Sequence, residues 1–266
     1  MFTFRYHRPA SVDDALALVA AEDEAKYLAG GQTLLPTLKQ RLASPSDLID
    51  LGDIAGLSGI RVEENRVVIG AMTPHADVAA SAAVRAAIPA LADLAGRIGD
   101  PAVRNRGTLG GSIANNDPSA DYPAACLGLD ATIVTTVREI PADAFFQGLF
   151  ETALAPAELI TAVSFPVPLR AAYEKFANPA SRYAMAGVLV AVTPAGVRVA
   201  VTGASQAGVF RWAEAEAALE ASFAPEALAG LALPAEDMIA DIHGSGAYRA
   251  HLAAVMARRA VARLAG

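Results

Sequence analysis

Cysteine is almost absent from this 266-residue sequence, whose single example is Cys126. One thiol cannot form an internal disulfide, and it cannot hold an iron–sulfur cluster, which needs about four thiolate ligands. A long apolar run is also missing, because the longest, near residues 185–192, is far shorter than the roughly 20 residues of a membrane span. We therefore expect a soluble chain with no transmembrane segment.

Positive charge is scarce, with 21 Lys and Arg against 28 Asp and Glu and a net charge of −7. No long basic block is present, which argues against nucleic acid as a partner. The first residues contain no apolar stretch followed by a small-residue cleavage site, so nothing marks the chain for secretion and we expect a cytoplasmic protein. No triad or paired acid and base is found, and we predict no catalytic side chain and no metal site.

Glycine and small polar residues gather in residues 100–121, which read DPAVRNRGTLGGSIANNDPSAD. Glycines leave backbone N–H groups free to turn toward an anion, Thr and Ser hydroxyls can donate to phosphate oxygens, and Arg104 and Arg106 can add positive potential. The length of this segment exceeds that of an ordinary connection, which is typical of a functional loop. A Gly-Gly pair also serves a tight surface turn, so both interpretations stay open.

A second glycine turn lies in residues 29–36, which read AGGQTLLP. It follows a predicted strand at residues 26–28 and precedes a predicted helix that begins at Pro36 and carries Leu35, Leu38 and Leu42 on one stripe. Two such turns suit a diphosphate better than one. Neither matches a P-loop or the Rossmann fingerprint, so a different nucleotide-binding fold is indicated.

The rest of the chain alternates helix and strand signals. Ser11 is a predicted helix N-cap, residues 59–70 read as a hairpin, and residues 173–202 read as an antiparallel meander with a turn at 193–196. His75 is interpreted as a helix-surface or packing residue, because no second ligand stands at the helical spacing. A final helix at residues 248–264 ends in arginines that suit a helix C-terminus or a partner contact.

The two glycine turns, residues 29–36 and 104–112, together with NDPSAD at 116–121, resemble the FAD-binding medium subunit of the molybdenum hydroxylases. The resemblance is to the xanthine dehydrogenase family and closest to the carbon monoxide dehydrogenase type. Supporting matches extend along nearly the whole chain, at residues 4–9, 69–74, 173–176, 182–184 and 247–251.

This resemblance implies an α+β fold with a two-part FAD-binding domain of the PCMH type over residues 1–168, divided into about 1–56 and 57–168. A small domain with an antiparallel sheet and helices follows at residues 169–266. It implies FAD as cofactor, held by Ala29, Gly30, Gly31, Gln32, Thr33, Leu34, Thr108, Leu109, Gly110, Gly111, Ser112, Asp121 and Tyr183.

Three of these residues need separate comment. Asp121 corresponds to a carboxylate near the ribityl and ring end of FAD, but it also reads as the N-cap of a helix at residues 122–129. Tyr183 is expected near the flavin ring, although an aromatic before a strand commonly packs in a core. Ser112 stands where many relatives carry Asn.

The resemblance also implies partners. A large subunit would carry the molybdenum cofactor, a small subunit would hold two iron–sulfur clusters, and the complex would be a dimer of heterotrimers. This chain would take electrons onto FAD and pass them to an external acceptor, whether a quinone, NAD or oxygen. Two alternatives stay open, a self-standing FAD oxidase and an assembly subunit without cofactor.

Overall fold

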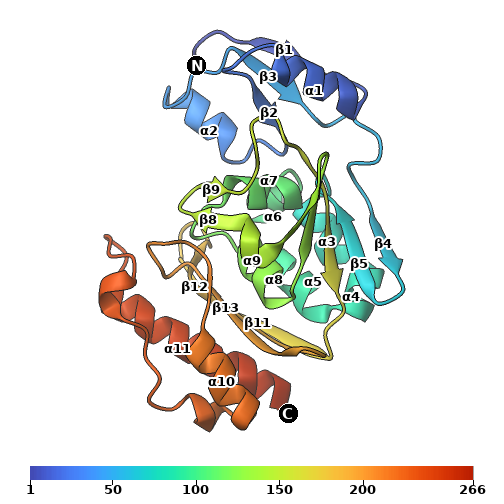
Figure 1. The fold of residues 1–266 in the computed structure, drawn as a ribbon. Helices are drawn as coiled ribbons and strands as arrows, with labels where there is room; N and C mark the ends of the chain where they lie inside the picture. The colour runs from blue at the N-terminus through green and yellow to red at the C-terminus, as the bar shows by residue number, and fades with distance from the viewer. Residues whose placement is uncertain (266) are drawn as a thin grey trace.

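The computed structural model describes residues 1–265 and arranges its three larger sheets one below the other (Figure 1). The uppermost is a three-stranded parallel sheet of order β1-β3-β2, which together with α1 and α2 forms the N-terminal unit. Its elements are β1 (Arg5–His7), α1 (Val12–Ala20), β2 (Lys26–Leu28), α2 (Leu34–Lys39) and β3 (Asp47–Asp50). The predicted N-cap of α1 is confirmed, since the Ser11 hydroxyl accepts from the Asp14 amide at 3.1 Å.

The middle unit is built on a five-stranded antiparallel sheet of order β4-β5-β10-β6-β7. The predicted hairpin at its edge is confirmed as β4 and β5. The strands of this unit are β4 (Ile60–Glu63), β5 (Arg66–Gly70), β6 (Thr132–Thr135), β7 (Glu139–Pro141), β8 (Phe146–Gly148), β9 (Glu151–Thr152) and β10 (Ile160–Pro166). Its helices are α3 (His75–Ala80), α4 (Ala82–Ala87), α5 (Pro89–Gly96), α6 (Pro101–Arg104), α7 (Leu109–Asn115), α8 (Tyr122–Gly128) and α9 (Ala142–Phe145).

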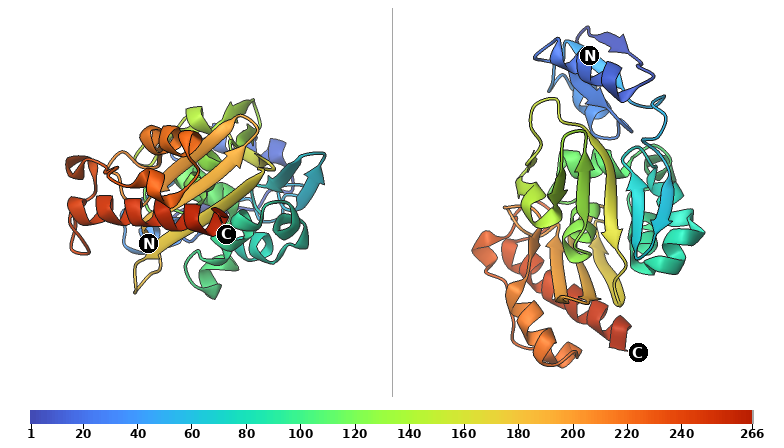
Figure 2. Two further views of the ribbon diagram at one scale, coloured as in Figure 1. Left: turned by 90° about the horizontal axis from the view of Figure 1, so that it is seen from below. Right: turned by 45° about the vertical axis from the view of Figure 1, so that its right-hand side comes forward.

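The lowest part, the C-terminal unit, is built on a four-stranded sheet that contains the predicted antiparallel meander. Helices α10 and α11 cover one of its faces (Figure 2), and α8 packs against the other. The elements are β11 (Arg170–Ala177), β12 (Ala184–Thr193), β13 (Gly196–Thr202), β14 (Phe210–Arg211), α10 (Ala213–Ala221), the 3-10 turns η1 (Pro225–Leu228) and η2 (Ala235–Asp237), and α11 (Gly246–Ala265).

Both faces of this last sheet are buried, which explains its nearly unbroken apolar sequence. Val188 and Val190 point into the core under α11, whereas Leu189 and Ala191 point into the core of the middle unit. Alternate residues of one strand thus join two cores, as the period of two along a strand requires. The predicted α+β fold is confirmed.

Two local predictions are corrected. Helix α2 begins at Leu34, two residues before the predicted start, because the Leu35 amide already donates to the Gly31 carbonyl. The Leu42 side chain is 73% exposed and leaves the apolar stripe, since the helix ends at Lys39 and Arg41 takes a left-handed conformation with φ 60°.

The segment expected as one long loop contains two short helices instead. Asp100 caps α6 by accepting from the Val103 amide, and Thr108 caps α7 by accepting from the Gly111 amide. Capping side chains therefore convert much of this glycine-rich segment into helix. Among residues 1–265, no helix combines the length and the apolar character that crossing a bilayer requires.

Candidate cofactor site

The two glycine turns, far apart in the sequence, touch each other in the structure. A Cβ on Gly30 would overlap the carbonyl oxygen of Arg106 and lie 2.8 Å from the Cα of Gly107. A Cβ on Gly111 would lie 3.3 Å from the Cβ of Ala29. Side chains at these glycines would hold the turns apart, so glycine permits the backbones to approach. Figure 1 shows the same arrangement, with α7 directly below the N-terminal unit.

The first turn presents a row of free backbone donors. Within the described chain, the N–H groups of residues 30–34 donate to no protein acceptor. Gly31 has φ +73°, a left-handed conformation that glycine adopts without strain. Gln32 and Thr33 are exposed, so the donors near them are open to a ligand. A row of unpaired N–H groups beside a helix start is a suitable receptor for phosphate oxygens.

The second turn differs from what the sequence predicts, because most of its backbone donors are used inside the protein. The Leu109 amide donates to the Thr73 carbonyl at 3.1 Å, and the Gly110 amide donates to the Ala71 carbonyl at 2.8 Å. The Gly111 and Ser112 amides both donate to Thr108, to its hydroxyl and carbonyl respectively. Within residues 1–265, the donors left over in residues 108–112 are the Thr108 amide and the hydroxyls of Thr108 and Ser112.

The two arginines beside the second turn have different surroundings. Arg104 donates through Nη1 to the carbonyls of Ile98 and Gly99, at 2.9 and 3.0 Å. The Arg104 side chain therefore stabilises the backbone at residues 98–99, and its guanidinium is engaged there instead of at the glycine loop, where the sequence predicted that it adds positive potential. Arg106 is exposed, and its side chain has no hydrogen-bond or ion-pair partner within the described residues.

His75 packs beneath the second turn. Its amide donates to the Gly107 carbonyl at 3.0 Å, and its imidazole lies 5.2 Å from the Tyr122 ring between centroids. The side chain is only 4% exposed, and burial together with nearby Arg104 lowers the pKa of His75 to about 4. Of the two predicted roles, the structure selects packing.

Asp121 does not cap α8, because it has helical dihedral angles and its side chain makes no cap hydrogen bond. The buried carboxylate accepts instead from the Tyr173 hydroxyl at 2.5 Å and from the Lys175 ammonium at 3.0 Å. Burial raises the pKa of Asp121, while Lys175 and Tyr173 oppose that shift. This carboxylate links the middle unit to strand β11.

Lys175 is the residue of this site that sequence reasoning missed. Its side chain is 1% exposed, and its ammonium also donates to the Arg97 carbonyl. The available signal was the period of two along β11, which places Lys175 on the same face as Tyr173. A lysine on the buried face of a strand needs a carboxylate partner, and this partner, Asp121, is 54 residues away in the sequence.

Tyr183 lies beside the segment that carries Asp121. Its hydroxyl accepts from the Asn178 side chain at 3.2 Å, and its ring lies 6.1 Å from that of His243 between centroids. The next residue, Ala184, donates its amide to the Ser119 carbonyl at 3.3 Å. Tyr183 is therefore held near residues 116–121, and its place at a flavin ring stays a prediction.

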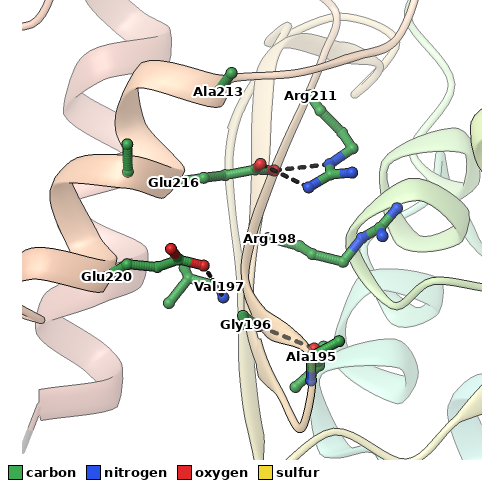
Figure 3. Close-up of a pocket in the computed structure, with 10 residues that line it drawn as sticks. Ala195, Gly196, Val197, Arg198, Arg211, Ala213, Glu216 and Glu220 are labelled. Atoms are coloured by element: carbon green, nitrogen blue, oxygen red, sulfur yellow. Dashed lines mark hydrogen bonds and ion pairs between the residues drawn. The ribbon is translucent and has the colours of Figure 1, made fainter.

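A separate hollow between the β12–β13 turn and α10 offers no unpaired arginine among its described lining residues (Figure 3). Arg211 makes a bidentate ion pair with Glu216, at 2.8 and 2.6 Å. Arg198 pairs with Asp130 and Asp143, at 3.0 and 2.6 Å. Because carboxylates already neutralise both arginines, the glycine turns remain the stronger candidate for an anionic ligand.

Known proteins resemble this chain in both sequence and fold. Residues 2–168 match the family model described as the FAD binding domain in molybdopterin dehydrogenase. The carbon monoxide dehydrogenase medium chain of Hydrogenophaga pseudoflava is 37% identical over 97% of this chain and 96% of its own. The nicotine 6-hydroxylase medium subunit of Paenarthrobacter nicotinovorans is 38% identical over 97% and 95%.

Solved structures give the same result over the whole fold. A chain of the reconstituted CO dehydrogenase from Oligotropha carboxidovorans superposes with a TM-score of 0.90, at 35% identity and with 98% and 97% of the two chains covered. A chain of quinoline 2-oxidoreductase from Pseudomonas putida 86 superposes with a TM-score of 0.87, at 28% identity and with 98% and 96% covered.

Proposed function

The chain belongs to the FAD-binding medium subunits of the molybdenum hydroxylases, and we propose that its two glycine turns hold the diphosphate of FAD. It is an oxidoreductase subunit with FAD as cofactor. The observation that carries the proposal is the row of unpaired N–H groups at residues 30–34, directly against the second turn. Oriented N–H dipoles stabilise a diphosphate without an obligatory metal ion.

The residues of the site divide into two groups. Ala29, Gly30, Gly31, Gln32, Thr33 and Leu34 form the donor side, and Thr108, Leu109, Gly110, Gly111 and Ser112 form the opposing side. Asp121 and Tyr183 belong to the predicted ring end of the site. When bound, FAD supplies the redox chemistry, because flavin accepts electrons singly or in pairs. The protein binds and orients it, and no side chain of this chain is assigned a chemical step.

The assignment implies a place in an electron-transfer complex. FAD would receive electrons from iron–sulfur clusters of a small subunit, after a large subunit with the molybdenum cofactor has oxidised the substrate. Since this chain has one cysteine, such clusters need ligands from another subunit. A dimer of heterotrimers, the identity of the external acceptor and a cytoplasmic location remain predictions.

Two measurements test the function. The purified full chain is titrated with FAD and its flavin spectrum recorded, and the native complex is purified so that its co-eluting subunits and metals are identified. We expect tight FAD binding and two partner subunits. Absence of flavin from both chain and complex would favour the assembly alternative, and turnover by the chain alone on a small alcohol would favour the oxidase.

A variant tests the second turn directly. In Gly111→Val the new Cβ would lie 2.9 Å from the Thr108 hydroxyl and 3.3 Å from the Ala29 Cβ, so the γ-methyls would push the two turns apart. We expect FAD retention to be lost while far-UV circular dichroism stays close to that of the wild type. Unchanged flavin content in this variant would remove the second turn from the site.

A further inference from the structure

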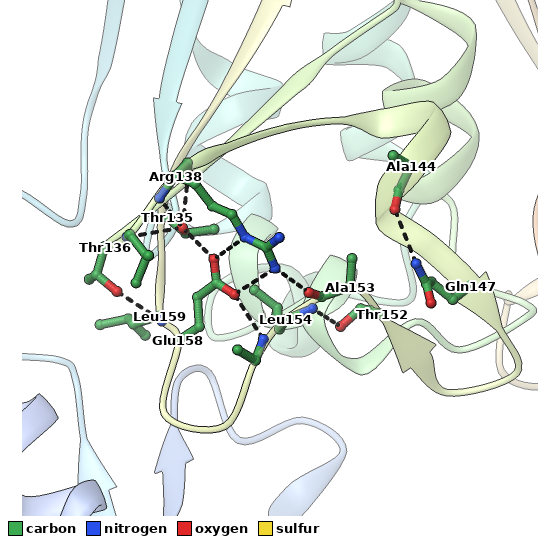
Figure 4. A network of polar contacts seen from close by, with 12 residues as sticks. Thr135, Thr136, Arg138, Ala144, Gln147, Thr152, Ala153, Leu154, Glu158 and Leu159 are labelled. Carbon is green, nitrogen blue, oxygen red and sulfur yellow. Dashed lines mark hydrogen bonds and ion pairs between the residues drawn. The ribbon is translucent and has the colours of Figure 1, made fainter.

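The connection between β9 and β10, residues 153–159, carries a polar network that the cofactor site does not use (Figure 4). At its centre, Arg138 makes a bidentate ion pair with Glu158, with both N–O distances at 3.1 Å. The Glu158 side chain is 2% exposed. A buried carboxylate is costly unless every oxygen is paired, so a network of this kind has to be complete.

Backbone groups of the connection complete the network. The Arg138 guanidinium donates to the Ala153 carbonyl at 2.6 Å, and the Glu158 carboxylate accepts from the Ala155 amide at 2.8 Å. The Thr135 hydroxyl donates to the same carboxylate at 2.7 Å. Ala157, next to Glu158, has φ +64°, a conformation that a residue with a side chain keeps only when its surroundings enforce it. The ion pair therefore fixes the path of the whole connection.

This connection contacts the N-terminal unit just ahead of the first glycine turn. The Tyr27 hydroxyl donates to the Ala157 carbonyl at 3.0 Å, and Leu159 is buried in the core of the N-terminal unit. Tyr27 lies on β2, three residues before Gly30. The same unit thus meets the middle unit through Tyr27 and Leu159 and through the glycine turns themselves, and Met72 of the middle unit also packs against its core.

We propose that the Arg138–Glu158 ion pair fixes the position of the first glycine turn relative to the second. It acts through the hydrogen bond between the Ala157 carbonyl and the Tyr27 hydroxyl. The inference rests on the proposed function, because the property it controls is the affinity for the diphosphate. If the first glycine turn shifted relative to the second, its N–H groups would remain unpaired but would no longer point at the same diphosphate. Arg138, Glu158 and Tyr27 touch no part of the cofactor in this scheme.

The test compares FAD dissociation constants of the full chain, measured by quenching of flavin fluorescence. Tyr27→Phe removes one hydroxyl, and we expect FAD to bind about 3-fold to 10-fold more weakly, the range of one lost hydrogen bond. Glu158→Gln breaks the ion pair, and we expect a loss of about 10-fold or more. The fold-loss of FAD affinity in the double variant should be smaller than the product of the two single fold-losses, because both substitutions act through the same contact.

Two further readouts separate positioning from a general loss of stability. ADP, which carries the diphosphate without a flavin, should lose affinity by the same factor in each variant. The matched control is Glu216→Gln, which breaks the bidentate pair with Arg211 and a bond to the Val199 amide (Figure 3). It should lower the melting temperature of the chain without FAD and leave the FAD dissociation constant unchanged.

The outcomes distinguish this inference from the function on which it rests. If Tyr27→Phe and Glu158→Gln bind FAD as the wild type does, while Gly111→Val has lost it, the positioning role is refuted and the function stands. If the wild-type chain and its complex contain no flavin, the function fails and the inference fails with it. Should Glu158→Gln not fold, Tyr27→Phe alone decides, since loss of its hydroxyl leaves the core packing intact.

Discussion

At the scale of single residues, Gly30 lies directly against the backbone of the second turn. In Gly30→Ala the new methyl would overlap the Arg106 carbonyl oxygen, which belongs to rigid backbone and cannot rotate away. Overpacking of this kind costs about 1–3 kcal/mol, and here it separates the turns, so we expect FAD affinity to fall about 10-fold or more. Isothermal titration with FAD measures the effect.

The control for Gly30→Ala is Gly96→Ala. The added methyl at the end of α5 would make an ordinary contact, 3.7 Å from the Ala79 Cβ. Alanine favours a helix over glycine by roughly 0.5–1 kcal/mol, so this variant should be as stable as the wild type or slightly more so. Equal FAD affinities in the two alanine variants would contradict the assigned contact between the turns.

His75 predicts a pH dependence at the same scale. Burial lowers the pKa of His75 to about 4, below the ordinary value near 6.5, so the unfolded chain binds the proton more readily. The contribution of the neutral imidazole to the free energy of unfolding is fully present above pH 6.5. It is lost as the pH falls toward 4, and the total loss is about 3 kcal/mol. Urea unfolding should show a shallower fall in His75→Gln between pH 6.5 and 5. An identical slope in both proteins would refute the buried neutral histidine.

At the scale of elements, the sequence was most informative where the signal is local. The Ser11 cap, the hairpin of β4 and β5 and the meander of β11 to β13 follow from spacing within about ten residues. The sequence did not predict helices α6 and α7, because glycine and asparagine are typical of turns. In the structure, the side chains of Asp100 and Thr108 cap these segments and stabilise them as helices.

The site was predictable as two turns but not as a set of donors. Whether a backbone N–H is free depends on acceptors that are distant in the sequence. Here the Gly110 amide donates to the Ala71 carbonyl, and the Leu109 amide donates to the Thr73 carbonyl. The same limit applies to Lys175, whose partner Asp121 belongs to another unit. Pattern reasoning identifies which residues are small or polar, and long-range pairing decides which of them remain available to a ligand.

The contact between Lys175 of β11 and Asp121, the residue before α8, gives a prediction about this buried pair. Lys175→Met would leave the Asp121 carboxylate buried without its cation, and we expect a loss of about 3–5 kcal/mol in the free energy of unfolding. Adding Asp121→Asn removes the isolated charge, so the double variant should recover part of the loss. Urea denaturation measures both. A double variant less stable than Lys175→Met alone would contradict this account.

At the scale of the whole molecule, the last helix ties the C-terminal unit to the rest. Arg263, expected as helix-end solvation or a partner contact, pairs with Asp93 of α5 at 3.0 Å and with Glu174 of β11 at 3.3 Å. Arg170 donates to the Leu264 carbonyl at 2.9 Å. Of these contacts, the Arg263–Asp93 pair joins the C-terminal unit to the middle unit, whereas the other two lie within the C-terminal unit. An exposed ion pair is individually weak, so the buried sheet faces supply most of the cohesion between the two units.

The N-terminal unit is attached differently, since it meets the middle unit largely through Tyr27, Leu159 and the glycine turns. A ligand bound to both turns would therefore join the two units. At an FAD concentration 100 times its dissociation constant, linkage predicts about 2.7 kcal/mol of added stability. For a chain of this size that corresponds to a rise of about 5–10 °C in melting temperature.

Differential scanning calorimetry with and without FAD measures this rise, and Gly30→Ala at the same FAD concentration serves as the control, whose shift should be about half as large or less. Limited proteolysis locates the effect, because FAD should protect the link between the N-terminal and middle units, residues 51–59, before any other segment. Protection confined to the C-terminal unit would mean that the ligand lies away from the two turns, and the stabilisation would then need another explanation.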